Sequence, residues 1–361
     1  MEVGLLGLPR SGKTTLFEAL TGAGAPHGSG AAGDRRLAVV KAGDPRLERL
    51  ALLYQPKKVV PAALTFVDVA GAATLGAPAS QALAEKVLLA LGEADALTLV
   101  IRAFPEEGRA PEAEADLATL RQELILADLV RVTTRLDRIE KSIHRQGGED
   151  RQRLERERQT LERCRRRLEG GGPLRGLGFD PVELKLLGAF QMMSLKPAVI
   201  VANVAEGEIA EAERWEDHLA HAAAPTGEPV LAVCAQVEKE IAALADPAER
   251  RAFLSSYGLA EPVVDRLIRA VYRAAGLITF FTANAREAHA WTTPAGTPVA
   301  AAAGRIHTDM ERGFIRAEVI GWEELARAGS MTQARREGRA RTEGRDYVVQ
   351  DGDVIEIRFS V

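Results

Sequence analysis

The chain contains 361 residues, with 47 Lys and Arg against 51 Asp and Glu, so its formal net charge is −4. This balance excludes a wholly basic, histone-like nucleic-acid binder, and the length is sufficient for two or three domains. The two cysteines, Cys164 and Cys234, exclude a disulfide scaffold and indicate a reducing compartment.

Short apolar strands alternate with helices in the first third of the chain and again after residue 197. The expected strands are Val3–Leu8, Leu37–Val40, Leu64–Val69, Leu97–Ile101, Ala198–Ala202 and Val230–Val233, and the expected helices are Thr14–Leu20 and Ala82–Leu91. Strands that are apolar along their whole length suit a sheet that is buried on both faces. The pattern therefore predicts an α/β domain with a mainly parallel sheet and helices on both of its faces.

The middle of the chain has the periodicity of helices. Apolar residues recur at alternating spacings of three and four, at Leu129, Val132, Leu136, Ile139 and Ile143. After a break at Gln146–Asp150, leucines recur every seven residues, at Leu154, Leu161 and Leu168. This spacing predicts two antiparallel helices zipped as a coiled-coil hairpin, inserted into the α/β domain.

The predicted hairpin is basic, unlike the rest of the chain. Residues 131–175 hold 14 Lys and Arg against 8 Asp and Glu, a net charge of +6. A solvated helical surface would account for this charge. An arm that contacts RNA phosphates would account for it equally well. Both interpretations stay open at this point.

The last part of the chain is richer in strands. The expected strands are Ile278–Thr282, Ala288–Thr292, Phe314–Ile320, Tyr347–Val349 and Val354–Phe359, with short helices at Val299–Arg305 and Trp322–Ala328. We expect a small α+β module of the β-grasp kind. The predicted organisation is an α/β domain of residues 1–115 and 182–277, a helical insertion of residues 116–181 and the C-terminal module of residues 278–361.

A phosphate-binding loop follows the first predicted strand. Residues 7–14, Gly-Leu-Pro-Arg-Ser-Gly-Lys-Thr, fit the P-loop pattern in full and precede a helix, as this motif requires. The glycines let backbone N–H groups surround a phosphate chain, and the helix N-terminus adds partial positive charge. Lys13 would bridge the terminal phosphates, and the Thr14 hydroxyl would ligate Mg²⁺.

An Asp-x-x-Gly segment, Asp68 to Gly71, closes the third predicted strand. A carboxylate at that point can hold Mg²⁺ through water, and the glycine N–H can contact the terminal phosphate. Lys13, Asp68 and Gly71 are therefore the candidate catalytic residues, and Thr14 and Asp68 are the candidate metal ligands.

Two further strand ends carry candidate groups for the base of a nucleotide. Asn203-Val204-Ala205-Glu206 stands where GTPases usually have Asn-Lys-x-Asp, so Val204 replaces the lysine and Glu206 replaces the aspartate that pairs with guanine. The Cys234-Ala235 pair stands where the last base-contacting segment usually lies.

The sequence resembles the YchF/Obg-like ATPase family of P-loop proteins, over nearly the whole chain. The segments that carry the resemblance are Gly276–Thr282, Ala290–Thr292, Gly304–Asp309, Gly313–Ile320 and Asp346–Val354, together with Leu124–Leu129 at the base of the hairpin. The resemblance implies a P-loop NTPase G domain, a coiled-coil insertion and a C-terminal TGS (DUF933) domain. It also implies hydrolysis of ATP in preference to GTP, association with ribosomes, and stress or redox regulation.

The resemblance also assigns roles to individual residues. It places the phosphates and metal on Pro9, Arg10, Ser11, Gly12, Lys13, Thr14 and Thr15, and the base on Asn203, Val204, Glu206, Cys234 and Ala235. The main chain of Val204 is the expected adenine contact.

The chain departs from the family in the segments expected to support hydrolysis. Residues 22–36 lack the threonine that would complete the Mg²⁺ shell, residues 72–78 lack most of the usual glycine-rich pattern, and residues 103–107 lack a histidine. We therefore expect binding of ATP with slow hydrolysis. A nucleotide-binding ribosome scaffold without useful hydrolysis and an Obg-type GTPase are the alternatives.

The expected partners are ATP, Mg²⁺, and a ribosome or rRNA bound through the basic arm and the TGS domain. No apolar run approaches the roughly 20 residues that span a bilayer, and no secretory signal is visible, so we expect a cytoplasmic monomer that does not bind membranes.

Overall fold

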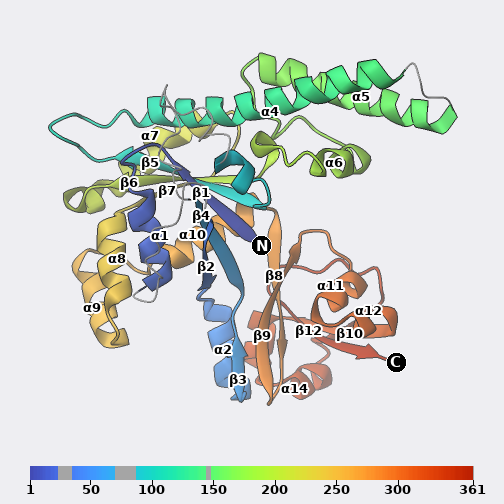
Figure 1. Ribbon diagram of the computed structural model, residues 1–361. Coiled ribbons are helices and arrows are strands. Elements are labelled where there is room, and N and C mark those ends of the chain that lie inside the picture. Colours follow the sequence, from blue (N-terminus) through green and yellow to red (C-terminus); the bar gives the residue numbers. More distant parts are fainter. Residues whose placement is uncertain (23–34, 70–86, 144–147, 361) are drawn as a thin grey trace. The chain divides into compact units, whose positions relative to one another are not determined.

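The computed structural model describes residues 1–22, 35–69, 87–143 and 148–360 (Figure 1). The chain forms two compact units. The first contains Met1–Val40 and Thr65–Leu267, and the second contains Lys41–Leu64 and Ile268–Val361. In the part of the chain that the structure describes, no helix is long and apolar enough to cross a membrane.

The first unit is built on a six-stranded sheet in the order β2-β4-β1-β5-β6-β7. Its strands are β1 (Glu2–Gly7), β2 (Arg35–Lys41), β4 (Ala63–Val69), β5 (Ala96–Ala103), β6 (Ala198–Val204) and β7 (Val230–Val233). The pairs β1–β4, β1–β5, β5–β6 and β6–β7 are parallel. The prediction of a mainly parallel sheet is therefore confirmed.

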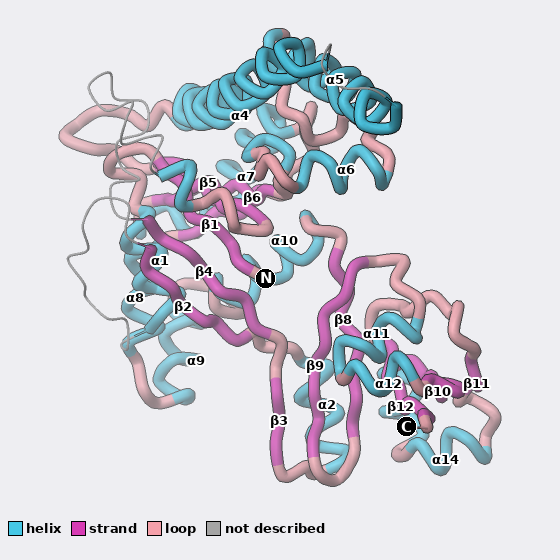
Figure 2. The backbone as a smooth tube through the Cα atoms, turned by 45° about the vertical axis from the view of Figure 1, so that its right-hand side comes forward, coloured by secondary structure: helices cyan, strands magenta, loops and turns pink. Residues whose placement is uncertain are grey.

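Helices cover both faces of this sheet (Figure 2). One face is covered by α4 (Ala113–Ile143) and α7 (Ala212–Ala223), and the other face by α1 (Lys13–Thr21) and α8 (Ala235–Ala243). Two further helices, α9 (Pro247–Ser256) and α10 (Val263–Ala274), follow α8. Because the strands are parallel, the carboxyl ends of β1, β4, β5, β6 and β7 meet at one edge, where ligands bind in sheets of this type.

The predicted helical hairpin is confirmed. Its two long helices are α4 and α5 (Gly148–Glu169), which lie side by side in Figure 1. The predicted apolar stripe is buried between them, and it includes Val132 and Ile139 of α4 and Leu161 and Cys164 of α5. A short helix, α6 (Pro181–Gly188), packs against the same cluster.

One carboxylate anchors the base of this hairpin. Asp128 of α4 has no exposed surface and accepts hydrogen bonds from the backbone N–H groups of Met193 (2.8 Å) and Ser194 (2.7 Å). Burial raises the pKa of this carboxyl group. The Leu124–Leu129 segment therefore fixes the point where the chain returns from the hairpin to β6.

The second unit contains another six-stranded sheet, in the order β11-β10-β12-β8-β9-β3. Its strands are β3 (Lys58–Val60), β8 (Leu277–Ala283), β9 (Glu287–Pro294), β10 (Phe314–Gly321), β11 (Arg341–Glu343) and β12 (Asp353–Phe359). Its helices are α2 (Pro45–Tyr54), α11 (Val299–Ile306), α12 (Thr308–Arg312), α13 (Trp322–Ala328) and α14 (Met331–Arg336).

Two features of this unit differ from the sequence-based expectations. Residues 41–64 pack here, because Leu47 and Leu50 of α2 share a core with Phe281, and β3 pairs with β9. Tyr347–Val349 is not a strand; its backbone forms one isolated bridge, from Val348 to Pro298. The sequence alone could not place α2, because its apolar stripe suits either unit.

Candidate functional site

The predicted phosphate loop has the backbone that its motif requires. It joins β1 to α1, with Arg10 at φ 63° and Gly12 at φ 84°. A Cβ at position 12 would also collide with the side chain of Asn203, so only glycine fits there. No side chain caps α1, which leaves its first N–H groups available to an anion.

The loop lysine is directed onto the carboxylate at the end of β4. Lys13 is 7% exposed, Asp68 is fully buried, and the Lys13 ammonium forms an ion pair with Oδ1 of Asp68. Arg36 of β2 forms a second ion pair with Oδ2 of the same carboxylate. The Arg36 guanidinium also lies over the ring of Phe17, 5.2 Å from its centroid. Sequence reasoning selected Lys13 and Asp68 but missed Arg36.

The remaining loop residues differ in their surroundings. Arg10 is exposed and forms ion pairs with Glu106 (3.1 Å) and Glu107 (2.9 Å), in the segment that follows β5. Ser11 is buried, and its hydroxyl has no hydrogen-bond partner among the described residues. Thr14 is exposed at the second position of α1.

The other loop residues add little to this geometry. Pro9 is exposed and Thr15 is half-buried. Gly71, the third candidate catalytic residue, lies outside the described residues.

Asn203 ties the phosphate loop to the neighbouring strand end. Its side chain is 5% exposed, donates to the Ser11 carbonyl (3.0 Å), and accepts from the Ala235 N–H (3.0 Å). Both partner residues are themselves buried. Asn203 therefore holds three segments of the site together.

The residues next to Asn203 are also largely buried. The side chain of Val204 is in the core of the first unit, which leaves its main chain as the group that a ligand could contact. Cys234 precedes α8, and burial raises the pKa of its thiol. Cys164 in the hairpin has a pKa raised to about 12 by burial. Neither thiol has the lowered pKa of a reactive cysteine.

Glu206 is exposed and begins a short 3₁₀ helix, η4 (Glu206–Glu211). The hydroxyl of Tyr257 donates a hydrogen bond of 2.6 Å to Oε1 of Glu206. This bond is the largest cause that raises the pKa of Tyr257 to about 12. Tyr257 directly follows α9, and nothing in the sequence pattern marked it as part of the site.

The donor set fits a magnesium ion of the kind bound together with a nucleotide. No group of three or more His, Cys, Asp or Glu side chains that could hold a metal occurs among the described residues. Mg²⁺ in such sites uses one or two protein ligands and completes its shell with phosphates and water. The exposed Thr14 hydroxyl and the Asp68 carboxylate at the same strand edge meet that requirement.

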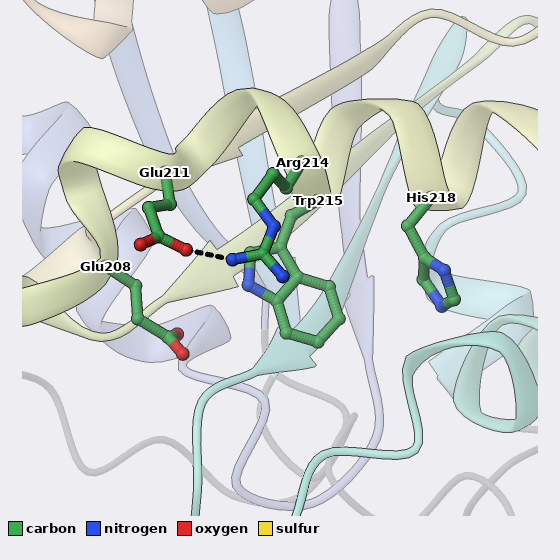
Figure 3. Close-up of a pocket in the computed structure, with 5 residues that line it drawn as sticks. All are labelled: Glu208, Glu211, Arg214, Trp215 and His218. Atoms are coloured by element: carbon green, nitrogen blue, oxygen red, sulfur yellow. Dashed lines mark hydrogen bonds and ion pairs between the residues drawn. The ribbon is translucent and has the colours of Figure 1, made fainter.

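A separate pocket of about 250 Å³ lies along η4 and α7 (Figure 3). It is lined by Glu208, Glu211, Arg214, Trp215 and His218, and Arg214 forms an ion pair with Glu211. The pocket begins two residues beyond Glu206 but contains none of the predicted phosphate- or base-binding residues. It is therefore distinct from the site at the strand ends.

Much of the positive charge of the hairpin is paired, either within the hairpin or with α6. Arg135 binds Glu157 (2.5 Å), Arg158 binds Glu155 (2.6 Å), and Arg163 binds Glu183. Exposed cations also occur along α5 and α6. Three of them, Arg153, Arg156 and Lys185, line a groove of about 680 Å³ between the hairpin and α6.

Comparisons with known proteins show which family the chain resembles. A family described as a 50S ribosome-binding GTPase matches residues 2–135, and a C-terminal family described as a protein of unknown function (DUF933) matches residues 277–360. Proteins named ribosome-binding ATPase YchF are 38% identical, from Bacillus subtilis over 371 residues and from Haemophilus influenzae over 368 residues. These alignments cover 100% of this chain and 100% and 99% of the two relatives.

A solved structure, that of the Schizosaccharomyces pombe YchF GTPase, has the same fold. It matches with a TM-score of 0.82 at 24% identity, over 99% of this chain and 97% of that one.

Proposed function

This chain belongs to the YchF family, and on that basis we propose that it is a ribosome-associated P-loop NTPase that binds ATP in preference to GTP and hydrolyses it slowly. The observation that carries the proposal is the convergence of Lys13, Asp68 and Asn203 at one strand edge, around a loop whose sequence fits the complete P-loop motif. The relatives named as ribosome-binding ATPases support both the nucleotide and the partner.

The preference for ATP rests on the residues that replace the guanine-binding motif. A site built to hydrogen-bond guanine leaves buried polar groups unpaired when another base binds, so its discrimination is large. Here Val204 replaces the lysine that lies along guanine, and Glu206 is longer than the usual aspartate. With its Val204 main chain available, the site suits adenine.

Slow hydrolysis follows from what surrounds the phosphate loop. Catalysis needs an oriented water and groups that stabilise the charge of the transition state. The loop after β5 supplies Glu106 and Glu107, which bind Arg10, and has no histidine. The segments 23–34 and 70–86 that would supply the other groups lie outside the described residues, and their sequences lack the usual threonine and most of the glycine pattern.

Mg²⁺ would bind with the nucleotide. Thr14 would ligate it and Asp68 would hold it through water, and the ion would neutralise charge on the phosphate oxygens. Both oxygens of Asp68 are engaged by Lys13 and Arg36, so these cations would have to release the carboxylate as Lys13 turns to the phosphates.

The ribosome, or its rRNA, is the proposed macromolecular partner, bound through the helical hairpin and the C-terminal TGS domain of residues 278–361. Exposed cations on α5 and α6 supply the charge for phosphate contacts. Binding to ribosomes places the protein in the cytoplasm, and we propose that it acts there as a monomer.

Calorimetric titration with ATP and with GTP, in the presence and absence of ribosomes, tests the proposal together with co-sedimentation with ribosomes and a turnover assay. We expect ATP to bind at least as tightly as GTP, and the protein to sediment with ribosomes. GTP binding tighter by about a hundredfold, or about 2.8 kcal/mol at 1.4 kcal/mol per decade, would identify an Obg-type GTPase. Binding without any measurable turnover would identify a scaffold.

A further inference from the structure

We propose that Tyr257 is a specificity-determining residue, which holds one carboxylate oxygen of Glu206 so that mainly the other oxygen is offered to the base, and thereby favours adenine over guanine. The inference rests on the proposed nucleotide-binding function. It concerns a residue outside the nucleotide-binding motifs, 51 positions away from Glu206 in the sequence.

The position of the tyrosine hydroxyl is set by the packing of its own ring. Tyr257 is half-buried and packs against the core of the first unit together with Phe253, with ring centroids 5.4 Å apart. Its backbone N–H donates to the Leu254 carbonyl (3.2 Å), at the end of α9. Glu206, in contrast, is exposed at the start of η4. The tyrosine is thus the fixed partner, and the glutamate is the side chain that is held.

The hydrogen bond between them is of a strong kind. Its length of 2.6 Å lies in the range of an O–H donor bound to an ionised carboxylate. A phenol is protonated at neutral pH, so Tyr257 is the donor in this bond; the bond itself raises the pKa of Tyr257 to about 12. Oε1 of Glu206 is therefore engaged, and Oε2 is the oxygen left to face a base.

The two purines make different demands on such a carboxylate. Guanine presents two adjacent donors, its ring N–H and its 2-amino group, which a free carboxylate accepts with both oxygens. Adenine presents one amino group beside a ring nitrogen that is itself an acceptor, so a second carboxylate oxygen would face a lone pair. A glutamate whose Oε1 is held by the tyrosine presents mainly Oε2, which suits the single amino group of adenine. The second donor of guanine would have to share Oε1 with the tyrosine hydroxyl.

Measurement of ATP, GTP and ITP affinities for the wild type and Tyr257→Phe tests this role. ITP serves as the probe because hypoxanthine lacks the 2-amino group of guanine. We expect Tyr257→Phe to lower the ratio of ATP to GTP affinity about fivefold, or about 1 kcal/mol at 1.4 kcal/mol per decade. We also expect GTP to gain relative to ITP, since only GTP can use the oxygen that is released.

Two further variants separate a positioning role from a structural one. In the Glu206→Ala background, Tyr257→Phe should leave the ATP-to-GTP ratio unchanged, because the tyrosine acts through Glu206. Phe253→Leu changes one neighbour of the ring but keeps the hydroxyl, the contact of Tyr257 with the core of the first unit and its backbone hydrogen bond to Leu254. It should therefore retain the wild-type ratio.

The outcomes distinguish this inference from the proposed function. An unchanged ratio in Tyr257→Phe, with ATP still preferred by the wild type, would overturn the role of Tyr257 alone. A wild type that prefers GTP, with a ratio that still shifts in Tyr257→Phe, would overturn the ATP preference and support the role of Tyr257. Absence of nucleotide binding in the wild type would overturn both.

Discussion

Replacement of Asn203 by alanine would test whether this side chain holds the site together. The substitution removes the acceptor of the Ala235 N–H and the donor to the Ser11 carbonyl, each at 3.0 Å. Ser11 and Ala235 are 2% and 1% exposed, so water cannot readily replace the lost partner. An unsatisfied buried polar group costs about 1–3 kcal/mol, and two such groups give an expected loss of about 2–6 kcal/mol in the stability of the first unit.

The assay should resolve the two units, because they need not unfold together. Hydrogen exchange of peptides from β6 and α8, measured along a urea series, reports on the first unit separately. We expect these peptides to lose protection at lower urea, and ATP affinity to fall at least tenfold because the phosphate loop loses its anchor.

Asn284→Ala is a matched control. The Asn284 side chain also makes two backbone hydrogen bonds, accepting from Arg286 (2.8 Å) and Glu287 (3.1 Å), but it lies in an exposed turn of the second unit. Water can satisfy those donors, so the loss should be under about 1 kcal/mol. If Asn203→Ala cost no more than Asn284→Ala and bound ATP normally, the anchoring role of Asn203 would be refuted.

Three further predictions concern charged groups. Lys13→Ala should abolish ATP binding, and the wild type should hydrolyse ATP at about 10⁻³ s⁻¹ or less. A wild-type rate of about 1 s⁻¹ without a partner, lost in Lys13→Ala, would show that hydrolysis is efficient. Replacement of the exposed hairpin arginines Arg151, Arg153 and Arg156 by glutamate should weaken co-sedimentation with ribosomes, most strongly at low salt, and leave ATP affinity unchanged. Unchanged co-sedimentation would show that these charges serve only to solvate the hairpin. Burial raises the pKa of Glu238 to about 7, above its unfolded value, so its contribution to the free energy of unfolding is complete below about pH 4.5 and is lost as the pH rises through 7. In urea unfolding between pH 5 and 8, Glu238→Gln should lose less stability with rising pH than the wild type. The same pH profile in both proteins would contradict the raised pKa.

The sequence predicted those parts of the fold whose signals are local. The strands of the parallel sheet have continuous apolar runs, and Val230–Val233 and Trp322–Ala328 match their predicted bounds as β7 and α13. The hairpin followed from the spacing of its leucines. The prediction of a short strand at Tyr347–Val349 was wrong, because three apolar or aromatic residues suit a partly buried loop as well as a strand. The exchange of residues 41–64 into the second unit depends on tertiary packing, which no local pattern encodes.

The same distinction applies to the site. Lys13, Thr14 and Asp68 are found from the sequence because phosphate chemistry requires them at fixed spacings from strand ends. Arg36 and Tyr257 were missed because each reaches the site from an element that no motif connects to it.

These contacts bear on how nucleotide choice is encoded in this chain. Two motif carboxylates are each partly engaged by a residue outside the motif: Asp68 by Arg36, and Glu206 by Tyr257. A carboxylate with one oxygen engaged presents a different hydrogen-bonding pattern from a free one, although the motif letters are the same. The Asn-x-x-Glu motif therefore does not determine the preferred base by itself; the partner of the glutamate shares in that choice. A substitution at the end of α9 could alter nucleotide preference while every residue of the P-loop and of the base motif stayed the same.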